Sequence, residues 1–67
     1  MTVLIETELE VDGRWIAEAP ELAGVMAYGS TRDEAIQKVQ ALALRVLADR
    51  LENDQSGQLL SVSFEAA

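Results

Sequence analysis

The chain has 67 residues and a mass of 7.3 kDa, which is enough for one small domain over residues 1–67 and too little for two. It contains no cysteine and no histidine, which excludes a disulfide framework and removes the commonest general base and metal ligand. Twelve acidic residues against five basic ones give a formal charge of −7, which disfavours nucleic-acid binding and favours a basic protein as partner.

Two alternating segments joined by a turn open the chain. In Thr2–Val11 apolar residues alternate with glutamates, and this period of two predicts a strand with one buried and one solvated face. Asp12-Gly13 suits the positive φ angles of a type I′ turn. Arg14–Ala19 alternates again, so the two segments are predicted to pair as an antiparallel hairpin.

A short third strand and one long helix follow. Pro20 ends the hairpin because it cannot donate a ladder hydrogen bond, and Val25–Tyr28 is predicted as the third strand. Thr31 and Glu34 have the spacing of a capping box, which predicts a helix over Arg32–Asn53. Its apolar residues form one stripe that should face the sheet: Ala35, Ile36, Val39, Leu42, Ala43, Val46 and Leu47.

The last predicted element is a strand in which Leu60, Val62 and Phe64 alternate with polar residues. The element order is then β-β-β-α-β, which predicts a single α+β domain with a mixed four-stranded sheet. A right-handed crossover that places the last strand beside the first gives the sheet order 3-2-1-4. One helix then covers one face of the sheet, and the third strand lies at an edge.

A row of glutamates is the first candidate for chemistry. Glu6, Glu8 and Glu10 lie about 6–7 Å apart along one strand face. A divalent metal site would need ligands from other elements, and no Asp, Asn or His stands ready to supply them. The serine and threonine hydroxyls have no histidine to activate them. We therefore expect a solvated face, no catalytic, cofactor-binding or metal-binding residues, and no enzyme activity.

Two segments resemble a known family. Trp15–Gly24 reads WIAEAPELAG, a strand that ends in acid-x-Pro-x-Leu-x-Gly, and Gly29–Ala35 reads GSTRDEA, which leads into the helix. In this order and spacing they resemble the N-terminal domain of HicB-type antitoxins. The resemblance implies a partial RNase H-like fold without its catalytic carboxylates. It also implies a role in neutralising HicA-type toxins, which are small basic ribonucleases.

The chain departs from this family at two points. Ser30 stands where an acidic residue is usual, and either residue type can cap a helix. Family members usually continue into a DNA-binding segment, whereas this sequence ends three residues after Phe64. We therefore expect no C-terminal DNA-binding segment and no direct DNA binding.

The leading hypothesis is a cytoplasmic, non-enzymatic protein-interaction module of a toxin–antitoxin system. It would be an antitoxin that binds a small basic HicA-type toxin, or an orphan relative. The alternative is a nucleic-acid-binding module that stacks bases on Trp15, Tyr28 or Phe64 at the sheet face. A magnesium-dependent hydrolase that uses the glutamates is a third possibility. No apolar stretch has the length of a membrane span, so no membrane contact is expected.

A thin core and the open edge of the third strand also predict a homodimer or a larger homo-oligomer. Tyr28 and Met26 lie on the uncovered face of that strand, and Leu44 and Leu51 lie at the margin of the helix stripe. Trp15 is expected in the core, with a partner contact as the alternative. The candidate interface residues are Glu18, Glu21, Leu22, Met26, Tyr28, Leu44 and Leu51.

Overall fold

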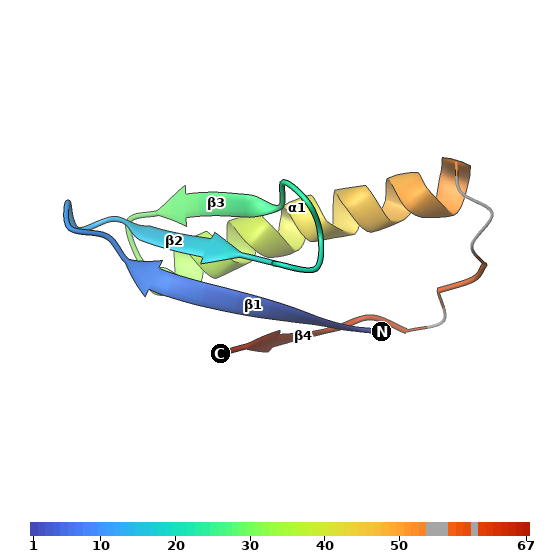
Figure 1. The fold of residues 1–67 in the computed structure, drawn as a ribbon, viewed down its shortest axis with the longest axis horizontal. Coiled ribbons are helices and arrows are strands. Elements are labelled where there is room, and N and C mark those ends of the chain that lie inside the picture. The colour runs from blue at the N-terminus through green and yellow to red at the C-terminus, as the bar shows by residue number, and fades with distance from the viewer. Residues whose placement is uncertain (54–56, 60) are drawn as a thin grey trace.

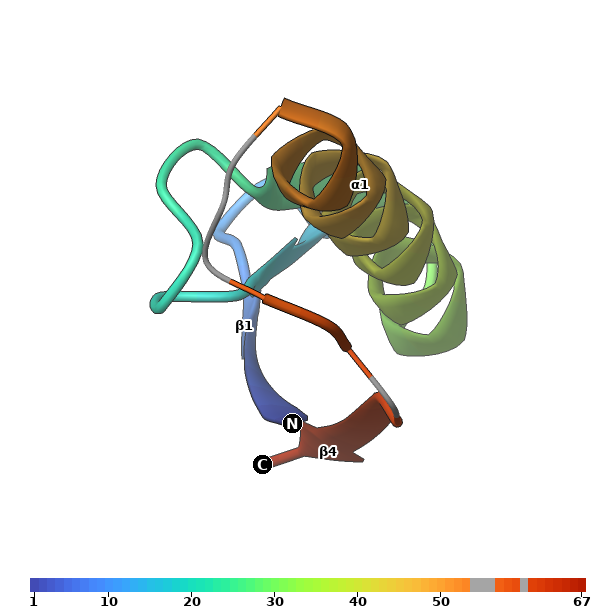
Figure 2. The ribbon, with the colours of Figure 1, turned by 90° about the vertical axis from the view of Figure 1, so that its right-hand side faces the viewer.

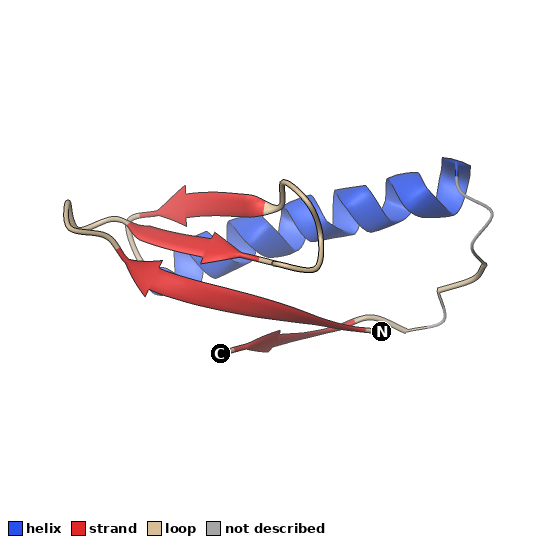
Figure 3. Ribbon diagram, in the orientation of Figure 1, coloured by secondary structure: helices blue, strands red, loops and turns tan. Residues whose placement is uncertain are grey.

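The computed structural model describes residues 1–53, 57–59 and 61–67. Its elements in chain order are β1 (Thr2–Leu9), β2 (Trp15–Glu18), β3 (Met26–Gly29), α1 (Arg32–Asn53) and β4 (Ser63–Ala66) (Figure 1). The strands form one layer and α1 forms a second layer that extends beyond the sheet at its C-terminal end (Figure 3). Seen along the long axis, the helix lies on one side of the strands (Figure 2).

The sheet is mixed and has the order β3-β2-β1-β4. β2 pairs antiparallel with both β1 and β3, whereas β4 runs parallel to β1 and places Phe64 opposite Val3. The predicted α+β domain of β-β-β-α-β order, with its 3-2-1-4 sheet and single helix, is therefore confirmed. One face of the sheet packs on α1, and no helix of the described residues covers the other face.

The β1–β2 connection differs from the predicted type I′ turn. That turn needs a positive φ at both Asp12 and Gly13, but only Gly13 has one, at 90°. The N–H of Glu10 donates to the carbonyl of Arg14 (2.7 Å), and the N–H of Gly13 donates to that of Glu10 (3.0 Å). The loop therefore has three residues and ends in a left-handed glycine, a common alternative for hairpins.

Helix α1 has the predicted bounds, and its N-terminus is capped by Thr31. The Thr31 Oγ1 accepts a hydrogen bond from the N–H of Glu34 (3.1 Å), as the capping-box spacing predicts. The reciprocal half of the box is different, because the Glu34 carboxylate instead accepts from the Ser30 hydroxyl (3.0 Å) and pairs with Lys38 (3.1 Å). The predicted stripe is confirmed as buried or half-buried throughout.

The core lies between the covered sheet face and this helix stripe. Ile5 and Val39 are its largest fully buried side chains from the two layers, and Trp15, half-buried, packs against it as predicted. Apolar burial of this kind contributes about 25 cal/mol per Å². The remaining buried members are Val3, Ala17, Ala19, Leu22, Val25, Ala35, Ala43 and Leu47.

β1 and β2 are shorter than the alternating patterns predicted, whereas β3 has its predicted length and is shifted by one residue. β1 ends at Leu9 and leaves Val11 fully exposed in the loop, because pairing stops where the three-residue connection begins. β2 and β3 each span four residues, and Val25 precedes β3 rather than opening it. Of the residues that predicted the last strand, Phe64 lies in β4, Val62 precedes it, and Leu60 lies outside the described residues.

Candidate functional site

The sheet face that α1 does not cover is the main candidate surface, and it is called the open face below. Pairing places Glu6, Glu18 and Met26 in one row across three strands, and Glu8, Ile16 and Tyr28 in the next. Leu4 and Glu65 form a further row between β1 and β4. Directly opposed residues share a face, so these side chains line one surface.

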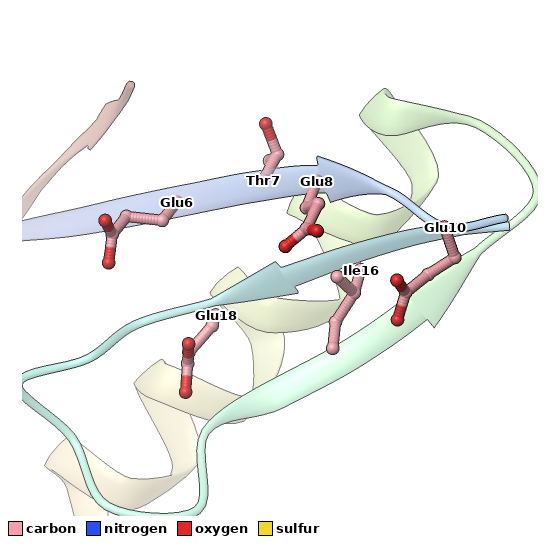
Figure 4. Close-up of a pocket in the computed structure, with 6 residues that line it drawn as sticks. All are labelled: Glu6, Thr7, Glu8, Glu10, Ile16 and Glu18. Atoms are coloured by element: carbon pink, nitrogen blue, oxygen red, sulfur yellow. The ribbon is translucent and has the colours of Figure 1, made fainter.

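Acidic side chains dominate the β1–β2 part of the open face. Glu8, Glu10, Ile16 and Glu18 extend on the same side of the ribbon, whereas Thr7 points to the opposite side (Figure 4). Glu6 lies directly opposite Glu18, so two like charges are neighbours across the strands. This pair of glutamates does not stabilise the sheet, because like charges directly opposite one another destabilise a strand pair.

The hollow between these side chains is shallow and has a volume of about 290 Å³. Its lining is Glu6, Thr7, Glu8, Glu10, Ile16 and Glu18. Small-molecule sites are usually enclosed and mostly apolar, which this surface is not. Among the described residues, no three or more acidic side chains are placed to hold a metal ion. The geometry of this hollow therefore does not enclose a small ligand.

Arg14 brings one positive charge to the β2–β3 side of this surface. Its guanidinium carbon lies 4.3 Å from the centre of the Tyr28 ring, a cation–π arrangement. The Arg14 Nε also donates to the Asp12 carboxylate (2.8 Å), and the Arg14 N–H donates to the other carboxylate oxygen (3.1 Å). These two hydrogen bonds from Arg14 lower the pKa of Asp12, the backbone bond having the larger effect. Arg14 thus holds the Tyr28 ring and the hairpin loop together.

The structure groups some of the predicted interface residues and separates others. Glu18, Met26 and Tyr28 lie together on the open face, and Tyr28 and Met26 are 39% and 42% exposed. Glu21 is exposed in the β2–β3 connection. Leu44 and Leu51 are about half exposed, but they lie on α1 and away from that face.

The prediction for Leu22 as an interface residue is wrong. Its side chain is 2% exposed and belongs to the core. The reason lies in the β2–β3 connection, where the Leu22 N–H donates to the Ala19 carbonyl (3.0 Å) and the Val25 N–H donates to the Leu22 carbonyl (3.1 Å). These bonds fold the connection back over the sheet, so Leu22 covers the end of the core.

Two apolar residues of the open face were not among the predicted interface residues. Ile16 is half-buried between the rows of glutamates and the β3 side chains, and Leu4 is 37% exposed. The signal that identifies both is the period-two alternation, which places them on the same side as the glutamates. Alternation assigns a face, but it does not rank the residues of that face as contacts.

Comparisons with known proteins add no relative. No protein-family model matches the chain, and neither a curated protein nor a solved structure matches it. The HicB resemblance therefore rests on the residues of Trp15–Gly24 and Gly29–Ala35 alone. Within residues 1–53, 57–59 and 61–67, no helix has the length and apolar character needed to cross a membrane.

Proposed function

We propose that this chain is a non-enzymatic, cytoplasmic interaction module of the HicB type, which binds a small basic protein through its open face. One observation carries the proposal: Glu6, Glu8, Glu10 and Glu18 gather around Ile16 on a sheet face that no described helix covers. The sequence resemblance supplies the class of partner, a HicA-type ribonuclease toxin. The net charge of −7 has the sign that attracts such a protein.

The open face combines the two contributions that a protein interface needs. Its carboxylates steer a basic partner and set its orientation. Its apolar side chains, Ile16, Met26 and Tyr28, supply surface that can be buried in the contact. Tyrosine is also enriched among the residues that carry most of the binding energy at interfaces.

Two features favour protein binding over the alternatives. The Thr31 hydroxyl caps α1 by accepting from the Glu34 N–H, and the Ser30 hydroxyl donates to the Glu34 carboxylate, which argues against a role as nucleophile for either. Tyr28 could stack on a base, but it shares its face with Glu8 and Glu18, whose charges oppose the phosphates of a nucleic acid.

Two experiments with a HicA-type toxin from the source genome test the proposal. In titration calorimetry the wild-type chain should bind the purified toxin. In a growth assay the wild-type chain should restore growth to cells that express the toxin. The pair Glu8→Lys and Glu18→Lys should weaken binding at least about tenfold, because it reverses charge at the centre of the open face. The matched control is Asp49→Lys with Glu52→Lys, which makes the same change in net charge on exposed residues of α1.

The control pair should change affinity by less than about threefold, a difference under 1 kcal/mol. If both pairs of substitutions weakened toxin binding equally, net charge and not the open face would account for the binding, and the proposed site would be wrong. Absence of binding by the wild-type chain would refute the antitoxin role. A low-salt gel shift with RNA at micromolar protein would instead favour the nucleic-acid alternative.

A further inference from the structure

The outer edge of β3 pairs with no other strand among residues 1–53, 57–59 and 61–67, and it carries a defined set of hydrogen-bonding groups. The Ala19 N–H donates to the Val25 carbonyl (2.9 Å), so the carbonyl of residue 25 points toward β2. Backbone groups alternate in direction along an antiparallel strand, so those of Ala27 also point toward β2. The N–H and C=O groups of Met26 and Tyr28 consequently point outward, away from the sheet.

This edge carries no chemical block against pairing. Natural sheets protect their edges with short strands, charged side chains, prolines or bulges; β3 is short, at four residues, but none of the residues Met26–Gly29 is charged or proline. The other edge of the sheet, β4, carries Glu65. On β3 the outward side chains of the open face are apolar, and Met26 and Tyr28 keep about 40% of their surface exposed.

We infer that a second copy of this chain pairs antiparallel with β3, so that two four-stranded sheets become one. The two-fold axis passes beside Ala27, and Met26 lies opposite the partner's Tyr28. In this register the outward groups of Met26 and Tyr28 are matched on both strands, and each methionine thioether lies beside a tyrosine ring, which is a favourable contact. The interface is self-complementary, as a two-fold dimer requires.

Electrostatics allow a second copy at this edge despite the charge of −7. Across the junction, Glu18 would be followed by Met26, the partner's Tyr28 and the partner's Ile16, so no carboxylate lies at the centre of the joined face. The Arg14 guanidinium over each Tyr28 ring adds a positive charge there. The nearest glutamates of β2 in the two copies stand three strand spacings apart, about 14 Å or more. This exceeds the Debye length of about 8 Å at physiological ionic strength, so their repulsion is largely screened.

A dimer would also bury surface that a chain of this size cannot bury in its own core. Domains of about 60 residues bury only about 60% of the surface of their unfolded chain. With no cysteine for a disulfide, oligomerisation is a remaining source of stability. The inference does not rest on the proposed function, although the dimer uses Met26 and Tyr28, which that function also assigns to the partner contact. Glu6, Glu8 and Glu10 stay accessible on both outer flanks of the joined sheet.

Light scattering at micromolar concentration tests the inference. The wild-type chain should have a mass near twice 7.3 kDa, and Met26→Lys should raise the dissociation constant at least about tenfold. Leu44→Lys is the matched control, because Leu44 is similarly exposed (49%) but lies on α1. A monomeric wild-type chain, or dissociation by Leu44→Lys and not by Met26→Lys, would overturn the inference. Circular dichroism confirms that each variant is folded.

Cysteine cross-linking tests the register, since the natural chain contains no cysteine. A mixture of Met26→Cys and Tyr28→Cys chains should form a disulfide-linked dimer readily on mild oxidation, because directly opposed residues lie within disulfide reach. Either variant alone should cross-link several-fold less. Preferential cross-linking of one variant with itself would show a different register and refute the one inferred.

Discussion

At the scale of single residues, Gly29 has a steric role at the junction of β3 and α1. A Cβ at this position would lie 2.5 Å from the Ala35 backbone nitrogen and 3.0 Å from both the Ala35 Cα and the Thr31 carbonyl oxygen. All three neighbours are backbone atoms, which cannot rotate away. Gly29 therefore allows the start of the helix to approach the sheet closely.

Gly29→Ala should lower the free energy of unfolding by about 1–3 kcal/mol, the usual cost of overpacking. Urea unfolding of the two chains measures it. Gly24→Ala is the informative comparison. A Cβ there meets nothing within 4 Å, but φ is +78°, so this substitution should destabilise the fold through backbone strain and not through a clash.

Gly24→Asn should recover part of the stability lost in Gly24→Ala, because asparagine tolerates a left-handed backbone. Gly29→Asn should instead be at least as damaging as Gly29→Ala. A Gly29→Ala chain as stable as the wild type would contradict the steric role.

Residues differ in how far their environment follows from local sequence. The exposed Met26 and Tyr28 could be placed on the open face because strand alternation fixes the direction of their side chains. Leu22 could not be placed, because its burial depends on hydrogen bonds from Leu22 to Ala19 and from Val25 to Leu22, within an irregular connection. A loop has no period from which the direction of a side chain can be predicted.

At the scale of elements, the helix was predicted most accurately. Its capping threonine and its apolar stripe are local patterns, and both bounds of α1 agree with the structure. The hairpin loop was predicted less well, because Asp12-Gly13 fits more than one turn type. Here the Asp12 carboxylate accepts hydrogen bonds from the Arg14 backbone and side chain, and the loop holds three residues rather than two.

The N-terminus of α1 also makes the stability of the helix depend on pH. Hydrogen bonds from Lys38 and then from Ser30 lower the pKa of Glu34 below its ordinary value of 4.5. A carboxyl whose folded-state pKa is lowered stabilises the fold above its unfolded pKa, and this contribution is lost as the pH falls through the folded-state pKa. The charged form of Glu34 therefore supports the helix at neutral pH.

Glu34→Gln should lower the thermal midpoint at about pH 7, and the gap to the wild type should close as the pH is lowered below about 4.5. Thermal unfolding followed by circular dichroism over this range measures the gap. In a Lys38→Gln background the same substitution should cost less at neutral pH, because the first partner of the carboxylate is gone. A gap that persists unchanged into acid would contradict this account.

At the scale of the whole molecule, the sheet order could be predicted because few arrangements satisfy the connection rules. A hairpin, a short third strand and one right-handed helical crossover allow the last strand to lie beside β1, as observed. The function of the open face could not be predicted in the same way. Alternation and net charge predict an acidic surface, but a solvated face and a binding face share that pattern, as Glu6, Glu8 and Glu10 illustrate.

The charge of the open face is expected to oppose folding. Glu6 and Glu18 lie directly opposite each other, and like charges in this position destabilise a strand pair by about 0.2–1 kcal/mol. Glu18→Gln should therefore raise the free energy of unfolding by a similar amount at low ionic strength. Urea unfolding at fixed protein concentration measures it, and fixing the concentration keeps any effect of self-association constant.

Salt separates this repulsion from other effects of the substitution. In about 1 M sodium chloride the Debye length falls to about 3 Å, so the advantage of Glu18→Gln should largely disappear. Glu52→Gln makes the same change in net charge at an exposed position of α1. It should stabilise the fold less than Glu18→Gln does, because Glu52 lies on a helix and has no glutamate opposite it across a strand pair. A Glu18→Gln chain less stable than the wild type would mean that the carboxylate makes a favourable contact. Repulsion relieved by the substitution is the expected result for a surface whose acidic residues serve binding rather than stability.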